Sequence, residues 1–237
     1  MSNPFIYFLV LFLNAIQVSE IFAQASPSGY LDNIKTEMKK EWPSNRTINL
    51  VFHGHSVPSG YFKTPLVNSL GSYPFLLLKE LKNIYPSAVI NVIITAKGGE
   101  NSVNGEKRFD SDVLTHKPDV LFIDYALNDR MVGLEQSAMA MRKMITRALQ
   151  KGVKVILLTP TPHQNYNLLD TTNAYEPFAQ EIKALAKEFQ IGLADSYDSF
   201  RRKLQQGHSV TEYMSQINHP NQEGHQLVAE ELLKWFQ

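Results

Sequence analysis

The chain has 237 residues, of which 43% are hydrophobic and 19% charged, a composition typical of a globular protein rather than of a disordered or repetitive one. Lysines and arginines balance aspartates and glutamates, 23 against 23, so charge gives no reason to expect nucleic acid or an anionic membrane as a partner. The chain contains no cysteine, which excludes disulfides, thiolate metal sites and a cysteine nucleophile.

The first 25 residues have the pattern of a secretory signal peptide. The apolar run 5–16 is roughly 18 Å long as a helix, against a bilayer core of about 30 Å. Ala23-Gln24-Ala25 places small residues where a signal peptidase cleaves, so we predict cleavage before Ser26 and a periplasmic or secreted protein. Because no lysine or arginine precedes the apolar run, an uncleaved membrane anchor is the alternative. After cleavage we expect one domain over 26–237 and no stable membrane span.

Apolar runs of strand length then alternate with segments of helical spacing. Strands are predicted at 48–52, 89–94, 120–123, 153–158 and 191–194. Helices are predicted around 30–42, 76–84, in the polar stretch that ends at 115, and at 134–145, 182–189 and 227–236. Because the strand runs are apolar on both faces, the alternation predicts an α/β protein with a five-stranded, mainly parallel sheet covered by helices on each side.

Ligands of open parallel sheets bind beyond the carboxyl ends of the strands, so chemistry is expected in the residues that follow each strand. The first strand leads into a small-residue turn that carries Ser56 between His55 and Val57. A serine hydroxyl becomes a useful nucleophile when a base takes its proton and donors hold the resulting oxyanion. The long loop 159–172 follows another strand, and we interpret it as a candidate wall of a substrate site.

Four short blocks of the sequence together resemble the SGNH hydrolase superfamily of GDSL-like esterases and lipases. The blocks, in chain order, are Gly54-His55-Ser56, Gly98-Gly99, Ala126-Leu127-Asn128-Asp129 and Asn218-His219-Pro220-Asn221. The resemblance covers essentially the whole mature chain and implies a flavodoxin-like three-layer α/β/α sandwich. It also implies Ser56 as the nucleophile, His219 as the base, and an oxyanion hole formed by Ser56, Gly99 and Asn128.

The sequence departs from that pattern beside the proposed base. Members of the superfamily usually carry an aspartate three residues before the catalytic histidine, where this chain has Gln216. One hypothesis is a Ser-His pair assisted by Gln216 or by a backbone carbonyl. A second recruits an acid from elsewhere, such as Asp195, Asp198 or Glu100, and a third is a weakened or lost activity.

Histidine also replaces an aspartate next to the nucleophile. His53 and His55 lie two residues apart on an extended strand, so both point to the same side. We interpret His55 as forming a structural hydrogen bond to a neighbouring turn, and the alternative is that it serves as the base. No histidine or acidic residue has the spacing of metal ligands, so we expect neither a metal nor another cofactor.

These observations predict an exported serine esterase that removes acetyl or another short acyl group from a carbohydrate through an acyl-serine intermediate. The expected partner is a small-molecule or polysaccharide ester. The candidate stacking faces are Tyr61, Phe62, Tyr125, Tyr166 and Tyr175, although scattered aromatics more often serve packing. The alternatives are a hydrolase of lipid esters or thioesters, and a catalytically weakened member that binds acylated glycan without cleaving it.

Overall fold

Five parallel strands form one sheet in the computed structural model, which describes residues 25–237. The predicted signal peptide, apart from its last residue, lies outside the described residues. The strands of the sheet are β1 (Thr47–Gly54), β2 (Val89–Ile94), β3 (Val120–Asp124), β4 (Lys154–Leu158) and β5 (Gly192–Ala194). Their order is β2-β1-β3-β4-β5, and every neighbouring pair is parallel. A short antiparallel pair, β6 (Met214–Gln216) and β7 (His219–Pro220), lies outside this sheet.

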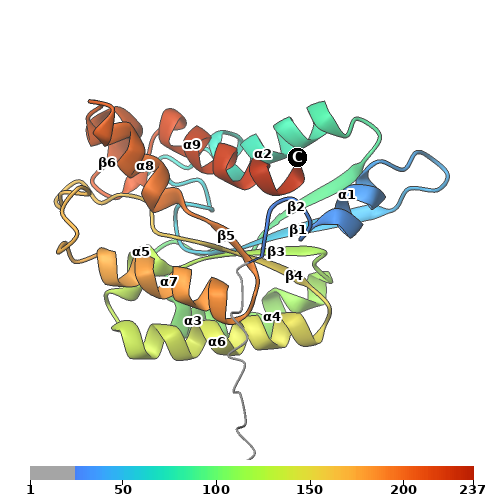
Figure 1. The fold of residues 1–237 in the computed structure, drawn as a ribbon, viewed down its shortest axis with the longest axis horizontal. Helices are drawn as coiled ribbons and strands as arrows, with labels where there is room; N and C mark the ends of the chain where they lie inside the picture. Colours follow the sequence, from blue (N-terminus) through green and yellow to red (C-terminus); the bar gives the residue numbers. More distant parts are fainter. Residues whose placement is uncertain (1–24) are drawn as a thin grey trace, which may run out of the picture.

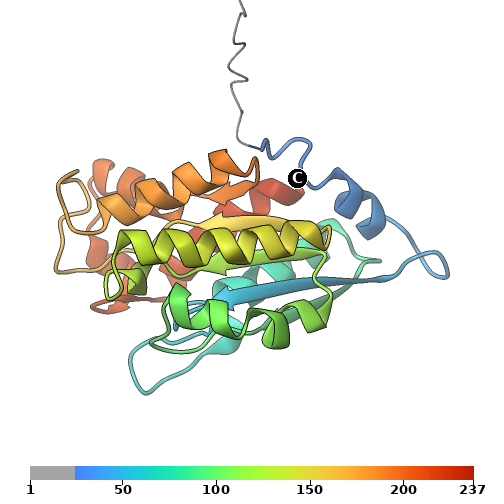
Figure 2. The same ribbon diagram turned by 90° about the horizontal axis from the view of Figure 1, so that it is seen from below.

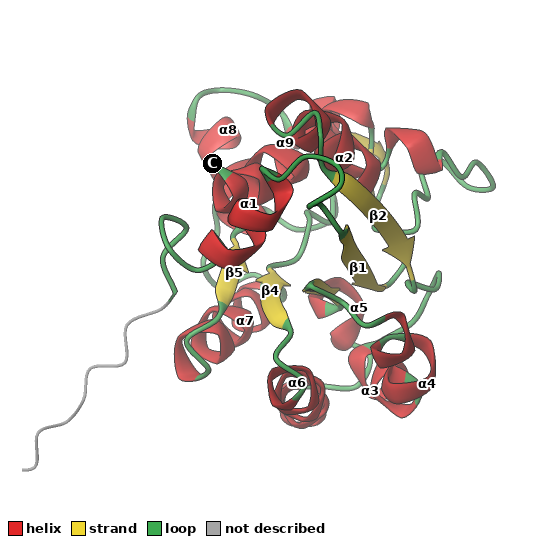
Figure 3. Cartoon of the chain, turned by 90° about the vertical axis from the view of Figure 1, so that its right-hand side faces the viewer, coloured by secondary structure: helices red, strands yellow, loops and turns green. Residues whose placement is uncertain are grey.

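Helices cover both faces of the sheet. The helices are α1 (Asp32–Met38), α2 (Tyr73–Ile84), α3 (Ser102–Lys107), α4 (Phe109–Asp112), α5 (Ala126–Asp129), α6 (Leu134–Gln150), α7 (Glu176–Glu188), α8 (Ser196–Gln205) and α9 (Gln222–Leu233). In Figure 1, α1, α2, α8 and α9 lie above the sheet, whereas α3, α4, α6 and α7 lie below it. Figure 2 shows the lower layer from outside, and Figure 3 shows both layers with the strands between them. The three-layer α/β/α sandwich expected from the sequence is therefore confirmed.

Strand β1, which lies between β2 and β3, shows why both layers are needed. Ile48, Leu50 and Phe52 pack into the hydrophobic cluster shared with α2 and α9, while Val51 packs into the cluster shared with α6 and α7. Successive side chains of a strand point to opposite faces, so a strand that is apolar throughout must be buried on both. The continuous apolar run in the sequence is thus explained by two separate cores.

The helices differ from the sequence-based expectation in two respects. The buried stripe of α6 contains Met141, Met144 and Ile145, as its spacing indicates, but Leu134 at the start of this helix is 40% exposed. Helix α8 was not predicted, although its N-terminus is capped by Asp195, whose carboxylate accepts a hydrogen bond from the Asp198 amide. None of the helices in the described part of the chain is long and apolar enough to cross a bilayer.

The end of β1 is closely packed against the end of β3, and this contact generates our first prediction. A Cβ atom at Gly54 would clash with the backbone carbonyl oxygen of Asp124, which cannot move without disturbing the β1–β3 pairing. We expect Gly54→Ala to lower the free energy of unfolding by about 2 to 3 kcal/mol in urea denaturation. Gly29→Ala is the control, because its nearest neighbour would lie 3.9 Å away, and a change within about 0.5 kcal/mol is expected. Equal stabilities of the two variants would contradict this packing argument.

Candidate active site

The four sequence blocks lie at the carboxyl ends of the strands or in the connections that reach that edge. His55 and Ser56 follow β1, Gly98 and Gly99 follow β2, and Asn128 lies on α5 directly after β3. His219 reaches the same region from the β6–β7 pair, and Figure 1 shows α5 and β6 at the left-hand end of the sheet. Because all strands of the sheet are parallel, loops from distant parts of the sequence meet at this one edge.

Ser56 and His219 are in direct contact. The His219 Nε2 atom lies 2.9 Å from the Ser56 Oγ atom, a hydrogen-bond distance, and both side chains are 6% exposed. Burial lowers the pKa of His219 below its ordinary value, and a hydrogen bond to the Phe62 backbone carbonyl opposes this shift. His219 is therefore neutral at pH 7, the state in which an imidazole accepts a proton.

Local hydrogen bonds hold the histidine in place. Asn221 caps α9 through its side chain, which accepts a hydrogen bond from the Gly224 amide and donates one to the Glu212 carbonyl. The Ser215 hydroxyl is 3.1 Å from the His219 carbonyl, across the β6–β7 pair. The residues around His219 in its sequence block thus anchor the loop at the start of α9, and the ring projects from this anchored backbone toward Ser56.

Two groups contact the other ring nitrogen of His219. The Nδ1 atom lies 2.8 Å from the Phe62 carbonyl oxygen and 2.7 Å from the Gln216 Nε2 atom. The Gln216 Oε1 atom accepts a hydrogen bond from the Thr64 amide at 3.0 Å, and this contact orients the side-chain amide with its nitrogen toward the histidine. The backbone carbonyl is therefore the acceptor on the side of the ring away from Ser56.

Phe62 belongs to a short hairpin over the site, which was not predicted from the sequence. The Asn68 amide donates to the Gly60 carbonyl at 2.8 Å, and Tyr61 bridges to Val67. The Phe62 ring stacks on buried His225 of α9, with ring centroids 4.8 Å apart. Helix α9, which follows His219 in the chain, therefore also holds Phe62, whose carbonyl contacts the His219 ring.

The candidate acids considered as partners of His219 are engaged elsewhere. Asp195 accepts from the Thr159 hydroxyl and the Asp198 amide and pairs with Lys183 at 2.7 Å. Asp198 pairs with Arg202, and Glu100 pairs with Arg108 and accepts from the Tyr125 hydroxyl at 2.7 Å. Among the described residues, no carboxylate contacts the His219 ring.

The three candidate oxyanion donors are available for a ligand. Within the part of the chain that the structure describes, the amides of Ser56 and Gly99 donate to no protein acceptor. Gly99 has a φ angle of +76°, a backbone conformation that glycine adopts readily and other residues rarely do. The Asn128 side-chain amide donates to the Glu100 carbonyl at 3.0 Å, which leaves its second N–H free.

A buried polar network surrounds Glu100, the residue after Gly99. The Tyr125 hydroxyl donates to the Glu100 carboxylate and lies 3.1 Å from the His53 Nε2 atom, while Arg108 binds the same carboxylate and the Thr95 carbonyl. Burial lowers the pKa of His53 to about 4, so its ring is neutral. His53 therefore supports the strand ends rather than contacting Ser56.

His55 has the structural role that the sequence analysis favoured. It is fully buried, and its Nδ1 atom accepts a hydrogen bond from the Val57 amide at 3.2 Å, in the turn that presents Ser56. Since Nδ1 is an acceptor, the proton is on Nε2, which lies 3.3 Å from an Asp124 carboxylate oxygen. A hydrogen bond from the Tyr73 hydroxyl reaches the other oxygen of Asp124.

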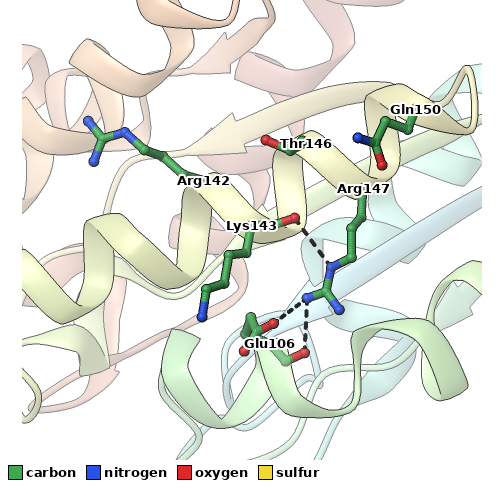
Figure 4. Close-up of a pocket in the computed structure, with 6 residues that line it drawn as sticks. All are labelled: Glu106, Arg142, Lys143, Thr146, Arg147 and Gln150. Carbon is green, nitrogen blue, oxygen red and sulfur yellow. Dashed lines mark hydrogen bonds and ion pairs between the residues drawn. The ribbon is translucent and has the colours of Figure 1, made fainter.

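Hollows occur both beside the site and away from it. One of about 280 Å³ includes Asn128 and Asn218, the neighbour of His219, in its lining. Another of about 490 Å³, between α3 and α6, is lined by Arg142, Arg147 and Glu106 among others but by no residue of the four blocks (Figure 4). The described residues include no group of three or more histidine or acidic side chains placed to hold a metal ion.

Known proteins resemble this chain in sequence and in structure. An acetylxylan esterase from Geobacillus stearothermophilus is 23% identical over 168 residues, which are 65% of this chain and 75% of that enzyme. A crystal structure of an acetylxylan esterase from the same organism matches with a TM-score of 0.70 at 20% identity, covering 80% of this chain and 94% of that one. An α/β hydrolase from the metagenome of Lake Arreo, Spain, also matches at 0.70 and 20% identity, over 84% and 97% of the chains.

Crystal structures of catalytic mutants of the Geobacillus enzyme match equally well. In these, a serine, an aspartate, or a histidine three positions after that aspartate is replaced by alanine, and the TM-scores are 0.70 to 0.71 at 20% identity, covering 84% of this chain and 96% of each mutant. Likeness at this identity shows the shared fold.

The sequence profile of the GDSL-like lipase/acylhydrolase family matches residues 52–227, a span that contains all four blocks and most of the chain. The chain therefore belongs to the GDSL-like lipase/acylhydrolase family, within the SGNH hydrolases, and is a serine-type ester hydrolase.

Proposed function

We propose that this protein removes acetyl groups from a carbohydrate, with Ser56 as the nucleophile and His219 as the general base. The observation that carries the proposal is the 2.9 Å contact between the Ser56 hydroxyl and the His219 Nε2 atom at the carboxyl end of a buried parallel sheet. A neutral imidazole at this distance accepts the hydroxyl proton as the oxygen attacks an ester carbonyl carbon.

The reaction then proceeds through an acyl-serine intermediate. The tetrahedral oxyanion accepts hydrogen bonds from the amides of Ser56 and Gly99 and from the free N–H of Asn128. As the intermediate collapses, His219 returns the proton to the leaving alcohol, and the acetyl group stays on Ser56. In the second half of the cycle the same histidine takes a proton from water as the water oxygen attacks this ester, and it gives that proton to the Ser56 oxygen as the C–O bond breaks and acetate leaves.

The Phe62 carbonyl replaces the carboxylate of a catalytic triad in this proposal. His219 acts as a base when its proton is on Nδ1, and a hydrogen bond from Nδ1 to the Phe62 carbonyl favours that tautomer. A neutral carbonyl stabilises the positive imidazolium less than a carboxylate does. Gln216 presents a donor to the same nitrogen and therefore works against the base tautomer.

Three lines of support indicate a carbohydrate acetate as the substrate. The relatives with matching sequence and fold include acetylxylan esterases. The hollow beside Asn128 is lined by polar and apolar side chains in about equal measure, a mixture that suits a sugar better than the long acyl chain of a lipid. The first 25 residues have the pattern of a signal peptide, so we also propose export, which gives access to polymeric glycans.

Substitution of the nucleophile tests the proposed chemistry. The wild type should hydrolyse p-nitrophenyl acetate faster than the butyrate and octanoate esters, and release acetate from acetylated oligosaccharides. Ser56→Ala should reduce both activities to background, because no other group replaces the attacking oxygen. The control is Ser59→Ala, which changes a hydroxyl in the same turn that donates to the His55 carbonyl at 3.0 Å. Full activity in Ser56→Ala would refute the assignment, and a preference for octanoate would favour a lipid hydrolase.

The second test concerns the oxyanion hole. Asn128→Ala should lower kcat by roughly a hundredfold to a thousandfold, the usual effect of losing one oxyanion donor, with a much smaller change in KM. The urea midpoint of the variant should stay close to that of the wild type, which separates a catalytic loss from unfolding. Near-normal kcat would remove Asn128 from the oxyanion hole.

The third test replaces the hydrogen-bond donor that faces the Nδ1 atom of His219 with an acceptor. In Gln216→Glu, one carboxylate oxygen keeps the Thr64 contact and the other replaces the donor facing His219. A carboxylate favours the protonated ring and raises its pKa, so the pH below which kcat/KM declines should move up by roughly one unit, with a higher plateau above it.

Gln216→Met is the matched control, because it keeps the length of the side chain and adds no charge. Because Gln216→Met removes the donor that faces Nδ1 without adding a negative charge, its acid limb should move up by much less than that of Gln216→Glu. An unchanged acid limb in Gln216→Glu would mean that this side chain does not act on His219.

A further inference from the structure

The hollow beside the oxyanion residues contains an arginine in an unusual setting. Its lining residues are Leu127, Asn128, Arg130, Met131, His163, Tyr175 and Asn218, and it encloses about 280 Å³. Asn128 is a proposed oxyanion donor and Asn218 precedes the proposed base, so a substrate whose ester lies at Ser56 extends naturally into this space. The remaining side chains of the hollow then contact the part of the substrate that bears the acetyl group.

Aromatic rings form one side of this hollow. The His163 and Tyr175 rings stack with centroids 5.6 Å apart and planes 24° from parallel, and the Tyr166 ring meets the Tyr175 ring edge-on at 5.2 Å. These residues come from the long loop after β4 and from the start of α7. Tyr175 is only 5% exposed, so the partly exposed rings of His163 and Tyr166 offer the apolar surface for the C–H faces of a sugar.

Arg130 is fixed against these rings. Its guanidinium carbon lies 4.9 Å from the Tyr166 ring centroid and 5.0 Å from that of Tyr175. One Nη1 group donates to the Tyr166 hydroxyl at 2.8 Å. A guanidinium has five N–H donors, so most of them stay available while the two rings hold its plane in position.

Arg130 differs from the other arginines in its charge partners. Of the seven arginines in the sequence, Arg46, Arg108, Arg142, Arg147, Arg201 and Arg202 each form an ion pair with a carboxylate. No such pair involves Arg130 among the described residues, and the hollow has no acidic residue in its lining. Its positive charge also contributes, after burial, to a lowered pKa of His163. The hollow is therefore a positively charged site without a counter-charge of its own.

We propose that this hollow binds a carboxylate-bearing sugar unit of the acetylated substrate, with the carboxylate on Arg130 and the sugar ring against the partly exposed rings of His163 and Tyr166. The planar guanidinium matches a carboxylate through paired hydrogen bonds. This inference rests on the proposed esterase function and specifies its substrate class as an acidic glycan.

The experiment compares two substrates that differ in one charge. An acetylated methyl uronide and the corresponding uronamide have almost the same shape, but only the first carries a carboxylate. The wild type should favour the charged substrate by roughly tenfold in kcat/KM at low ionic strength, and the preference should shrink as salt is added. Equal kcat/KM values for the two substrates would overturn the proposal.

Variants at Arg130 test whether this residue is the source of the preference. In Arg130→Gln the ratio of the two kcat/KM values should approach one, and Arg130→Lys should retain part of the preference because it keeps the charge. If Arg130→Gln lowers both activities equally and leaves the ratio unchanged, Arg130 merely holds the tyrosines and the proposal is wrong.

Arg142→Gln is the matched control. Arg142 is an exposed arginine in the hollow on α6, where it pairs with Glu188, and its loss should leave the preference intact (Figure 4). An equal loss of preference in this control would attribute the effect to overall charge and overturn the proposal. Hydrolysis of p-nitrophenyl acetate that depends on Ser56 reports the esterase function separately, so its persistence without a charge preference would refute the acidic substrate alone.

Discussion

The candidate site depends on a single proton, the one on the Nδ1 atom of His219. When Nδ1–H donates to the Phe62 carbonyl, the Nε2 atom is free to accept the Ser56 proton. If the proton moves to Nε2, the ring donates to the serine and no longer acts as a base. The position of one backbone carbonyl thus determines which of two nearly equal tautomers the histidine adopts.

That dependence explains why a hairpin remote in sequence is packed so firmly over the site. The Phe62 ring stacks on His225, and the His225 Nδ1 atom accepts a hydrogen bond from the Tyr73 amide at the start of α2. Burial lowers the pKa of His225 to about 3, so this ring stays neutral and keeps its acceptor. The hairpin, α2 and α9 therefore form one packed unit. Contacts within this unit hold the Phe62 carbonyl in position against His219.

The sequence predicts the candidate side chains of the site and the backbone amides within its blocks, but it does not identify the backbone carbonyl that contacts His219. Ser56 and His219 stand in short blocks whose order identifies the family, and the apolar strand runs place them at one edge of the sheet. The Phe62 carbonyl has no sequence signature, because every residue has a carbonyl and its direction is set by tertiary packing. Helix α8 did have a signal, an aspartate cap followed by Tyr197 and Phe200 at helical spacing, which was overlooked.

No carboxylate contacts His219 in the described structure, and this affects both the pKa of the histidine and the stability of its protonated form. Two of the acids considered as its partners are paired with basic side chains instead, Glu100 with Arg108 and Asp195 with Lys183. Without a free negative charge, and with its ring buried, His219 stays neutral at lower pH than an exposed histidine does. In the proposed mechanism, the same environment gives less stabilisation to the imidazolium formed as Ser56 attacks. The arrangement therefore extends the pH range in which the base is competent, at the expense of its strength as a proton acceptor in the transition state.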